Sequence, residues 1–216
     1  MLFVICVTTA VVCAVAAAVL SRWMRSVAAS DSRWLRSGLH VALAAAGGFG
    51  APYVALGMVD LATFAVLAVA CALLVTIDLA VFRLPDAIVL PLYPVVFLGL
   101  TVTAAEFGEW ASLGRAAAGA AVLLAGYFLL ALINPSGLGL GDVKLAGVLG
   151  AFLGWLGWPV VLVGTVAAFV INAAVALVLL AARQVGPKSG IAFGPAMVAG
   201  AVVGAAYAAV RSAAVL

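Results

Sequence analysis

The chain has 216 residues, of which 69% are hydrophobic and 8% are charged, and its mean hydropathy is +1.39. A soluble domain carries roughly 25% charged residues. This composition therefore argues against a soluble enzyme, a disordered regulator and, despite a formal net charge of +3, a nucleic-acid-binding protein. The chain is predicted to be all-α, a polytopic integral membrane helical bundle in which residues 1–216 form a single membrane-embedded domain.

The sparse charges separate apolar stretches close to the length of one bilayer crossing, about 20 residues. The first stretch lacks a positive n-region and is followed by Arg22 and Arg25, so it is predicted to be a retained span. The breakers at 134–137 end the fifth stretch, and Gly157 with Pro159 separates the sixth from the seventh. About eight transmembrane helices are expected, over residues 2–20, 38–58, 61–82, 87–105, 113–134, 142–158, 160–182 and 191–211.

Lys and Arg are distributed unevenly over the connections, and short cytoplasmic loops retain an excess of them. If the connection 21–37 is cytoplasmic, so are eight of the ten basic residues: Arg22, Arg25, Arg33, Arg36, Arg83, Lys144, Arg183 and Lys188. Arg115 and Arg211 then lie outside, with both termini and the interfacial Trp110 and Trp158. The predicted location is the cytoplasmic (inner) cell membrane.

A short repeat lies in that first connection, where RWMRS at 22–26 returns as RWLRS at 33–37. Arg beside Trp suits the headgroup layer of anionic lipid, with the indole in the interface and the guanidinium on phosphate. The simpler interpretation, which we prefer, is a reinforced topology signal.

The five aspartates differ in their setting. Asp31, Asp60 and Asp86 lie in connections or beside proline, where helix capping is a sufficient explanation. Asp78 lies in the apolar run VTIDLAVFRLP, where an ionisable group costs a few kcal/mol or more and usually faces a bundle interior or an aqueous cavity for a functional reason. The alternative is an interfacial Asp78 paired with Arg83.

Asp142 follows a glycine-rich turn that contains Gly137, Gly139 and Gly141. One interpretation is an N-cap of the next helix, and the other is a functional acid. Topology favours the second, because the third span ends near Asp78 and the sixth begins at Asp142 on the same predicted side.

Two carboxylates held together at a membrane edge cannot both ionise cheaply, so one keeps a proton. This condition suits aspartic proteolysis, in which the ionised acid activates water and the protonated acid supports the carbonyl oxygen. Gly139 and Gly141 are expected to let a peptide backbone approach Asp142. Lys144 is expected either to favour the ionised form of Asp142 or to extend to the interface as an ordinary lysine.

Three stretches of the sequence resemble the type IV prepilin peptidases, members of the GxGD class of membrane aspartic proteases. The stretches are IDLAVFRLPDAIVLP with Asp78 and Arg83, GLGLGDVKLAG with Gly139, Gly141, Asp142 and Lys144, and KSGIAFGPAMVAG with Phe193, Gly194 and Pro195. The resemblance implies an aspartic endopeptidase whose catalytic pair is Asp78 and Asp142, with the other seven residues binding substrate or supporting the site.

The implied substrate is a prepilin or pseudopilin with an apolar N-terminal helix, cut after glycine at the cytoplasmic face to release its basic leader. Long members of the family carry a cytoplasmic domain with CxxC motifs after the first span and also methylate the new N-terminus. The connection 21–37 holds no cysteine, so a short form without methylation, metal or cofactor is expected. The substrate pathway and the oligomeric state stay open.

Two alternatives come from other functional classes. A small proton- or cation-coupled secondary transporter would use the same two aspartates, although transport sites lie near the membrane midplane. A noncatalytic scaffold would be packed through small residues, such as Gly150 with Gly154 or Gly200 with Gly204.

Overall fold

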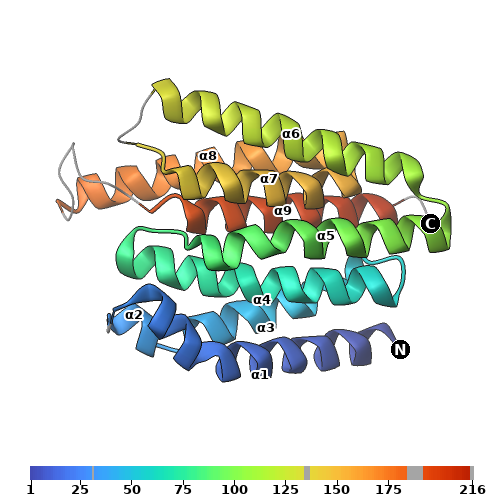
Figure 1. Cartoon of the computed structure of the whole chain (residues 1–216), viewed down its shortest axis with the longest axis horizontal. Coiled ribbons are helices and arrows are strands. Elements are labelled where there is room, and N and C mark those ends of the chain that lie inside the picture. Colours follow the sequence, from blue (N-terminus) through green and yellow to red (C-terminus); the bar gives the residue numbers. More distant parts are fainter. Residues whose placement is uncertain (31, 134–136, 184–191, 215–216) are drawn as a thin grey trace.

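The computed structural model describes residues 1–30, 32–133, 137–183 and 192–214, and Figure 1 shows their arrangement. Helices account for nearly all of these residues and none of them forms a strand, which confirms the all-α class. The elements are α1 (Leu2–Ala28), α2 (Arg33–Arg36), α3 (Leu39–Gly50), the 3-10 turn η1 (Ala51–Tyr53), α4 (Met58–Val81), α5 (Asp86–Phe107), α6 (Trp110–Ile133), α7 (Leu140–Leu156), α8 (Trp158–Ala181) and α9 (Gly194–Ala213).

The long helices share one direction and alternate in sense (Figure 1). The end at the left of Figure 1 holds the last turns of α1, α4, α6 and α8 and the first turns of α5, α7 and α9. We call it the Asp142 end. The N-terminus and the last turn of α9 lie at the opposite end, so the order of spans agrees with the predicted topology.

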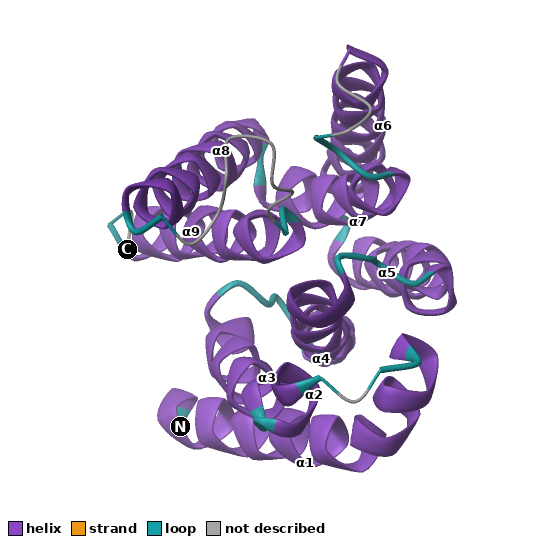
Figure 2. Ribbon diagram, turned by 90° about the vertical axis from the view of Figure 1, so that its left-hand side faces the viewer, coloured by secondary structure: helices purple, strands orange, loops and turns teal. Residues whose placement is uncertain are grey.

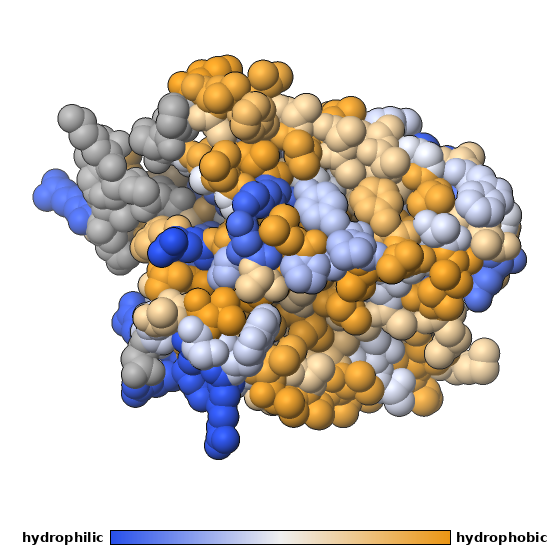
Figure 3. Space-filling model, in the orientation of Figure 1, coloured by the Kyte–Doolittle hydropathy of each residue, from blue (hydrophilic) through white to orange (hydrophobic). Residues whose placement is uncertain are grey.

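Six helices, α1, α4, α5, α6, α8 and α9, are long and apolar enough to cross a membrane. The 17-residue α7 is slightly shorter, about 26 Å, and α3 has 12 residues. Each of the eight predicted segments thus contains a helix within the described residues, and the polytopic bundle is confirmed. Figure 3 shows apolar side chains over much of the visible face, with the most hydrophilic residues gathered mainly toward the Asp142 end.

Two predicted boundaries were wrong. α3 ends at Gly50, well before position 58, because Pro52 lacks an N–H and its ring disrupts a continuing α-helix. α1 instead continues past position 20 to Ala28, since neither glycine nor proline interrupts it. The C-cap residue that follows is Ala29, whose φ of 46° is left-handed.

Two other boundaries match the breakers in the sequence. α6 ends at Ile133, immediately before the predicted cluster, of which 134–136 lie outside the described residues. Gly157 separates α7 from α8, and its φ of 130° suits glycine. The turn at Gly157 is therefore confirmed.

α4 lies at the centre of the bundle, between the α1–α3 group and helices α5 and α7 (Figure 2). In the apolar 18-residue stretch of α4, 61% is buried inside the protein, whereas in the corresponding stretch of α1 only 17% is buried. α6 packs on α7, and the carbonyl of Gly119 leaves no room for a side chain at Gly150. α8 packs on α9, and the carbonyl of Gly164 leaves no room for a side chain at Gly200. The predicted packing through small residues is confirmed, and the contact of α6 with α7 helps to position the helix that carries Asp142.

Candidate active site

Asp78 lies one turn before the end of α4, at the Asp142 end of the bundle. Its side chain is 4% exposed, and its Oδ2 accepts a hydrogen bond from the backbone N–H of Gly194 over 3.0 Å. α4 ends at Phe82, whose φ of 53° is left-handed. The acid is therefore enclosed by its own helix and by the start of α9.

Asp142 lies in the first turn of α7, where its Oδ2 accepts a hydrogen bond from the backbone N–H of Gly139 over 3.0 Å. Gly139 is the N-cap residue and Asp142 is the third helical residue, so Asp142 does not occupy the N-cap position that one of its two interpretations gave it. Asp142 nevertheless caps the helix through its side chain. Asp142 is partly exposed. Its Oδ2 accepts the capping hydrogen bond, and its Oδ1 does not take part in that bond.

The fold brings the two acids to the same end of the bundle, near enough for the charge of Asp142 to act on Asp78. Leu84, in the connection between α4 and α5, lies beside both chain segments that border the acids. A β-carbon on Gly141 would lie 2.8 Å from Leu84 Cβ, and one on Gly194 would lie 3.4 Å from Leu84 Cδ2. The position of Leu84 between these segments was not predicted from the sequence.

Two of the three glycines in the GLGLGD turn, Gly139 and Gly141, lie against other groups of this chain. Gly141 packs against Leu84, and a β-carbon on Gly139 would lie 3.4 Å from Oδ2 of Asp142. The tight glycine in this turn is thus Gly141, and its contact in the structure is with Leu84.

Lys144 and Arg83 do not pair with the two acids among the described residues. Lys144 Nζ contacts both carboxylate oxygens of Asp86, at 2.7 and 2.8 Å, and so joins α7 to the first residue of α5. Arg83 is exposed, whereas Asp78 is buried, and no ion pair between them is found in the described part of the chain. The alternative in which Arg83 pairs with Asp78 is therefore not observed, and Lys144 has a partner, Asp86, that neither interpretation of this lysine had named.

Phe193, Gly194 and Pro195 form the start of α9, with Phe193 as the N-cap residue. The Phe193 ring lies 6.0 Å from the ring of Tyr127 and 5.4 Å from that of Phe169. Ring contacts with α6 and α8 therefore hold the N–H of Gly194 in place beside Asp78.

Two tyrosines support the site without having been singled out from the sequence. Tyr127 is 4% exposed, and the charge of Asp142 acts on its hydroxyl. The Tyr93 hydroxyl donates a hydrogen bond to the carbonyl of Lys144 over 2.8 Å. Their only signal was a phenol group within an apolar helix, and such a group usually has a hydrogen-bond partner.

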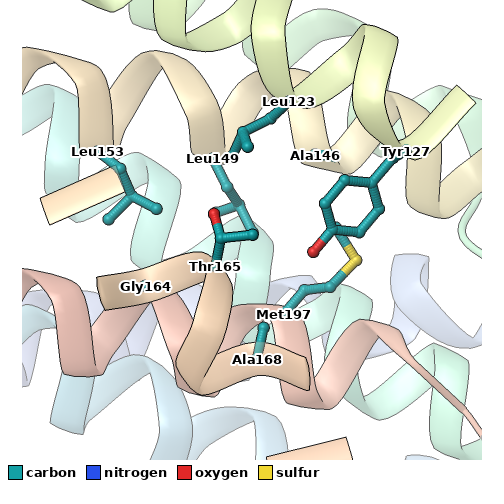
Figure 4. A pocket seen from close by; sticks show the side chains of 9 residues that line it. All are labelled: Leu123, Tyr127, Ala146, Leu149, Leu153, Gly164, Thr165, Ala168 and Met197. Carbon is teal, nitrogen blue, oxygen red and sulfur yellow. The ribbon is translucent and has the colours of Figure 1, made fainter. Parts of the chain in front are cut away.

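A small pocket lies beside Tyr127, among α6, α7, α8 and α9 (Figure 4). Its volume of about 10 Å³ admits roughly one water molecule. The hydroxyl oxygen of Thr165 borders it, is buried, and has no hydrogen-bond partner among the described residues. The pocket is too small for a peptide side chain, and neither Asp78 nor Asp142 lines it.

Metal-ligand residues do not gather within the described part of the chain, where no group of three His, Cys, Asp or Glu is placed to hold an ion. Cys6, Cys13 and Cys71 are free and buried. His40 Nε2 lies 2.7 Å from the hydroxyl of Ser21, between α3 and α1. This polar contact involves helices other than those that carry the two acids.

The fold and the site define a polytopic helical membrane protein with two aspartates at one end of its bundle. A sequence model described as the type IV leader peptidase family matches residues 65–180, more than half of the chain, so the chain belongs to that family. This confirms the resemblance. The matched region contains Asp78 and Asp142, whereas Phe193, Gly194 and Pro195 lie beyond it.

Similar curated proteins carry the name prepilin leader peptidase/N-methyltransferase. The protein of Pseudomonas putida is 39% identical over 117 residues, which are 52% of this chain and 38% of that protein. That of Burkholderia pseudomallei strain K96243 is 38% identical over 133 residues, 57% of this chain and 39% of its own. That of Pectobacterium carotovorum subsp. carotovorum is 34% identical over 140 residues, which are 61% of this chain and 46% of that protein. The matches thus span less than half of these relatives, and no solved structure matches the chain.

Proposed function

We propose that the chain is an aspartic endopeptidase that removes the basic leader of type IV prepilins or pilin-like proteins, cutting after glycine at the cytoplasmic face of the cell membrane. The observation that carries this proposal is the placement of Asp78 and Asp142. They come from different helices, lie at one end of the bundle, and interact electrostatically. The names of the curated relatives support the same reaction.

The proposed reaction uses the two aspartates with one shared proton. The ionised carboxylate removes a proton from water, and the water oxygen attacks the carbonyl carbon of the scissile peptide. The protonated carboxyl gives its proton to the carbonyl oxygen. When the tetrahedral intermediate collapses, the C–N bond breaks. The former carbonyl oxygen returns its proton to the carboxylate that donated it, and the carboxyl that took a proton from water protonates the leaving amine.

The substrate is proposed to lie with its apolar helix alongside the spans and its positively charged leader in the cytoplasm. A peptide bond at the junction of these two parts lies near the membrane surface. Asp78 is one turn from the end of α4 and Asp142 is in the first turn of α7, so both acids are at a matching level.

The same level disfavours the secondary-transporter alternative. Transport sites lie near the bilayer midplane, typically where helices are interrupted. Neither α4 nor α7 is interrupted at its acid, since each acid lies near the end of a continuous helix.

The proposal is tested by expressing the full chain in membranes with a prepilin that has a Lys/Arg-rich leader, and by following leader loss by mass. Asp78→Asn and Asp142→Asn preserve shape and remove the acid, and each is expected to lower cleavage by about a hundredfold or more. Glu106→Gln is the matched control, because Glu106 is an exposed acid at the opposite end. Full cleavage by either Asn variant would overturn the two-aspartate assignment.

A further inference from the structure

We infer that the Asp142 end of α1 carries a binding site for the phosphate headgroup of an anionic phospholipid, centred on Arg25. The site is a notch of about 340 Å³ lined by Arg25, Ser26, Ala29 and Ser30. The notch is largely open to the outside of the molecule. This inference is independent of the proposed peptidase activity, because it concerns a different part of the molecule.

The notch exists because α1 continues beyond its apolar stretch and then turns sharply. α1 ends at Ala28, and the left-handed Ala29 redirects the chain, with its N–H bonded to the carbonyl of Ser26. The hydroxyl of Ser26 donates to the carbonyl of Trp23 over 2.7 Å. These bonds hold the last turn of α1 beside Ser30, so one notch has walls from both parts of the turn.

The polar groups of the notch suit an anion. Arg25 forms no ion pair with an acidic side chain among the described residues, so its guanidinium has N–H donors to offer. Ser30 Oγ accepts a hydrogen bond from the backbone N–H of Ser32 over 3.3 Å, which leaves its own O–H to donate. None of the described residues that line the notch is an acid. Phosphate oxygens are acceptors that match this set of donors.

The depth of Arg25 points to a lipid as the source of that phosphate. The apolar stretch 2–20 spans about 28 Å as a helix, close to the roughly 30 Å hydrocarbon core of a bilayer. Arg25 lies about 8 Å further along α1, which is the depth of the headgroups. Trp23 and Trp34 are 43% and 37% exposed near this end, as interfacial indoles are.

Arg33 provides a comparison within the same connection. Its guanidinium lies 5.4 Å from the centre of the Trp34 ring and does not line the notch. Both arginines add charge to the same end of the bundle, so a diffuse attraction to anionic lipid would depend on them equally. A built site depends mainly on Arg25.

The test uses the full chain purified in detergent, with phosphatidylglycerol or phosphatidylcholine of the same acyl chains added and bound lipid measured by native mass spectrometry. Wild type is expected to retain phosphatidylglycerol in preference to phosphatidylcholine. Arg25→Gln is expected to weaken phosphatidylglycerol binding roughly tenfold more than Arg33→Gln, since it removes charge-assisted hydrogen bonds as well as charge. Arg211→Gln, at the opposite end, is expected to have no effect.

Three results would overturn the inference. Equal weakening by Arg25→Gln and Arg33→Gln would mean diffuse attraction only, and equal retention of the two lipids would mean no recognition of the headgroup charge. Displacement of phosphatidylglycerol by inorganic phosphate would mean a site for free phosphate. If Arg25→Gln melts far below wild type, Arg25→Lys replaces it, and this variant is expected to bind several-fold more weakly than wild type because lysine lacks the planar fork.

Discussion

The backbone N–H of Gly194 donates a hydrogen bond to Oδ2 of Asp78, so the first residue of α9 positions an acid on α4 that is 116 residues away in the sequence. A β-carbon on Gly194 would lie 2.8 Å from that same oxygen. The buried acid therefore has a partner and no spare space on this side. Any side chain at position 194 has to displace the carboxylate.

Gly194→Ala is therefore expected to reduce leader cleavage by at least roughly tenfold, because small displacements of catalytic groups are costly. The measurement is the initial cleavage rate in membranes with equal amounts of enzyme. Gly126→Ala is the matched control, since nothing lies within 4 Å of a β-carbon on Gly126. A native rate for Gly194→Ala would show that cleavage tolerates movement of Asp78.

The ion pair between Lys144 and Asp86 is expected to contribute only modestly to stability. The two side chains are 36% and 55% exposed, and exposed pairs typically contribute about 0.2–1 kcal/mol. A double-mutant cycle with Lys144→Met and Asp86→Asn, read from unfolding in mixed detergent micelles, is expected to give a coupling free energy in that range. A coupling energy well above this range would contradict the description of the pair as exposed to water.

The close approach of α6 to α7 makes a third prediction. Gly150→Ala forces a methyl group against the carbonyl of Gly119 and is expected to destabilise the protein by roughly 1–3 kcal/mol. Gly126→Ala, on the open side of α6, is expected to be neutral or to stabilise by up to about 1 kcal/mol. Thermal melting of both variants in one detergent compares them directly. Equal melting temperatures would contradict the packing described for Gly150.

Asp60 offers a contrast between a structural acid and the proposed catalytic ones. It is fully buried at the start of α4 and accepts N–H groups of Leu56, Gly57 and Leu61 at 2.6, 2.8 and 3.0 Å. Asp60→Ala is expected to lower the free energy of unfolding by roughly 1–3 kcal/mol, since it removes these bonds. Cleavage per folded molecule should match wild type. A loss of cleavage in correctly folded Asp60→Ala would point to a further role for this acid.

The order of the helices, and their approximate number within the described residues, could be predicted because charges are so sparse that their spacing follows the thickness of the bilayer. The ends of α1 and α3 could not be predicted from hydropathy. α1 carries Arg22 and Arg25 within its last turns, and α3 ends beside Pro52 after packing closely on Cys13 through Gly48. These ends depend on helix propensity and tertiary contact, and neither of these is visible in the apolar pattern.

The placement of Asp78 and Asp142 at one end could be predicted from topology, since every odd-numbered span ends on the side where every even-numbered span begins. Their partners could not. The contact of Lys144 with Asp86 depends on how α5 lies against α7, and the donor to Asp78 is a backbone N–H, which carries no residue-type signal. The alternative of an ion pair between Asp78 and Arg83 rested on sequence spacing, but the left-handed turn at Phe82 leaves Arg83 exposed.

The bond between Gly194 and Asp78 also bears on biosynthesis. Because the chain is made from its N-terminus, Asp78 enters the bilayer long before the ribosome reaches α9. Asp78 therefore lacks its hydrogen-bond donor, the N–H of Gly194, until that helix is made. The proposed centre is then complete only when the last helix is inserted. A premature stop before residue 194 leaves both aspartates in the membrane without the backbone N–H that binds Asp78. Such fragments are expected to cleave no substrate in the same membrane.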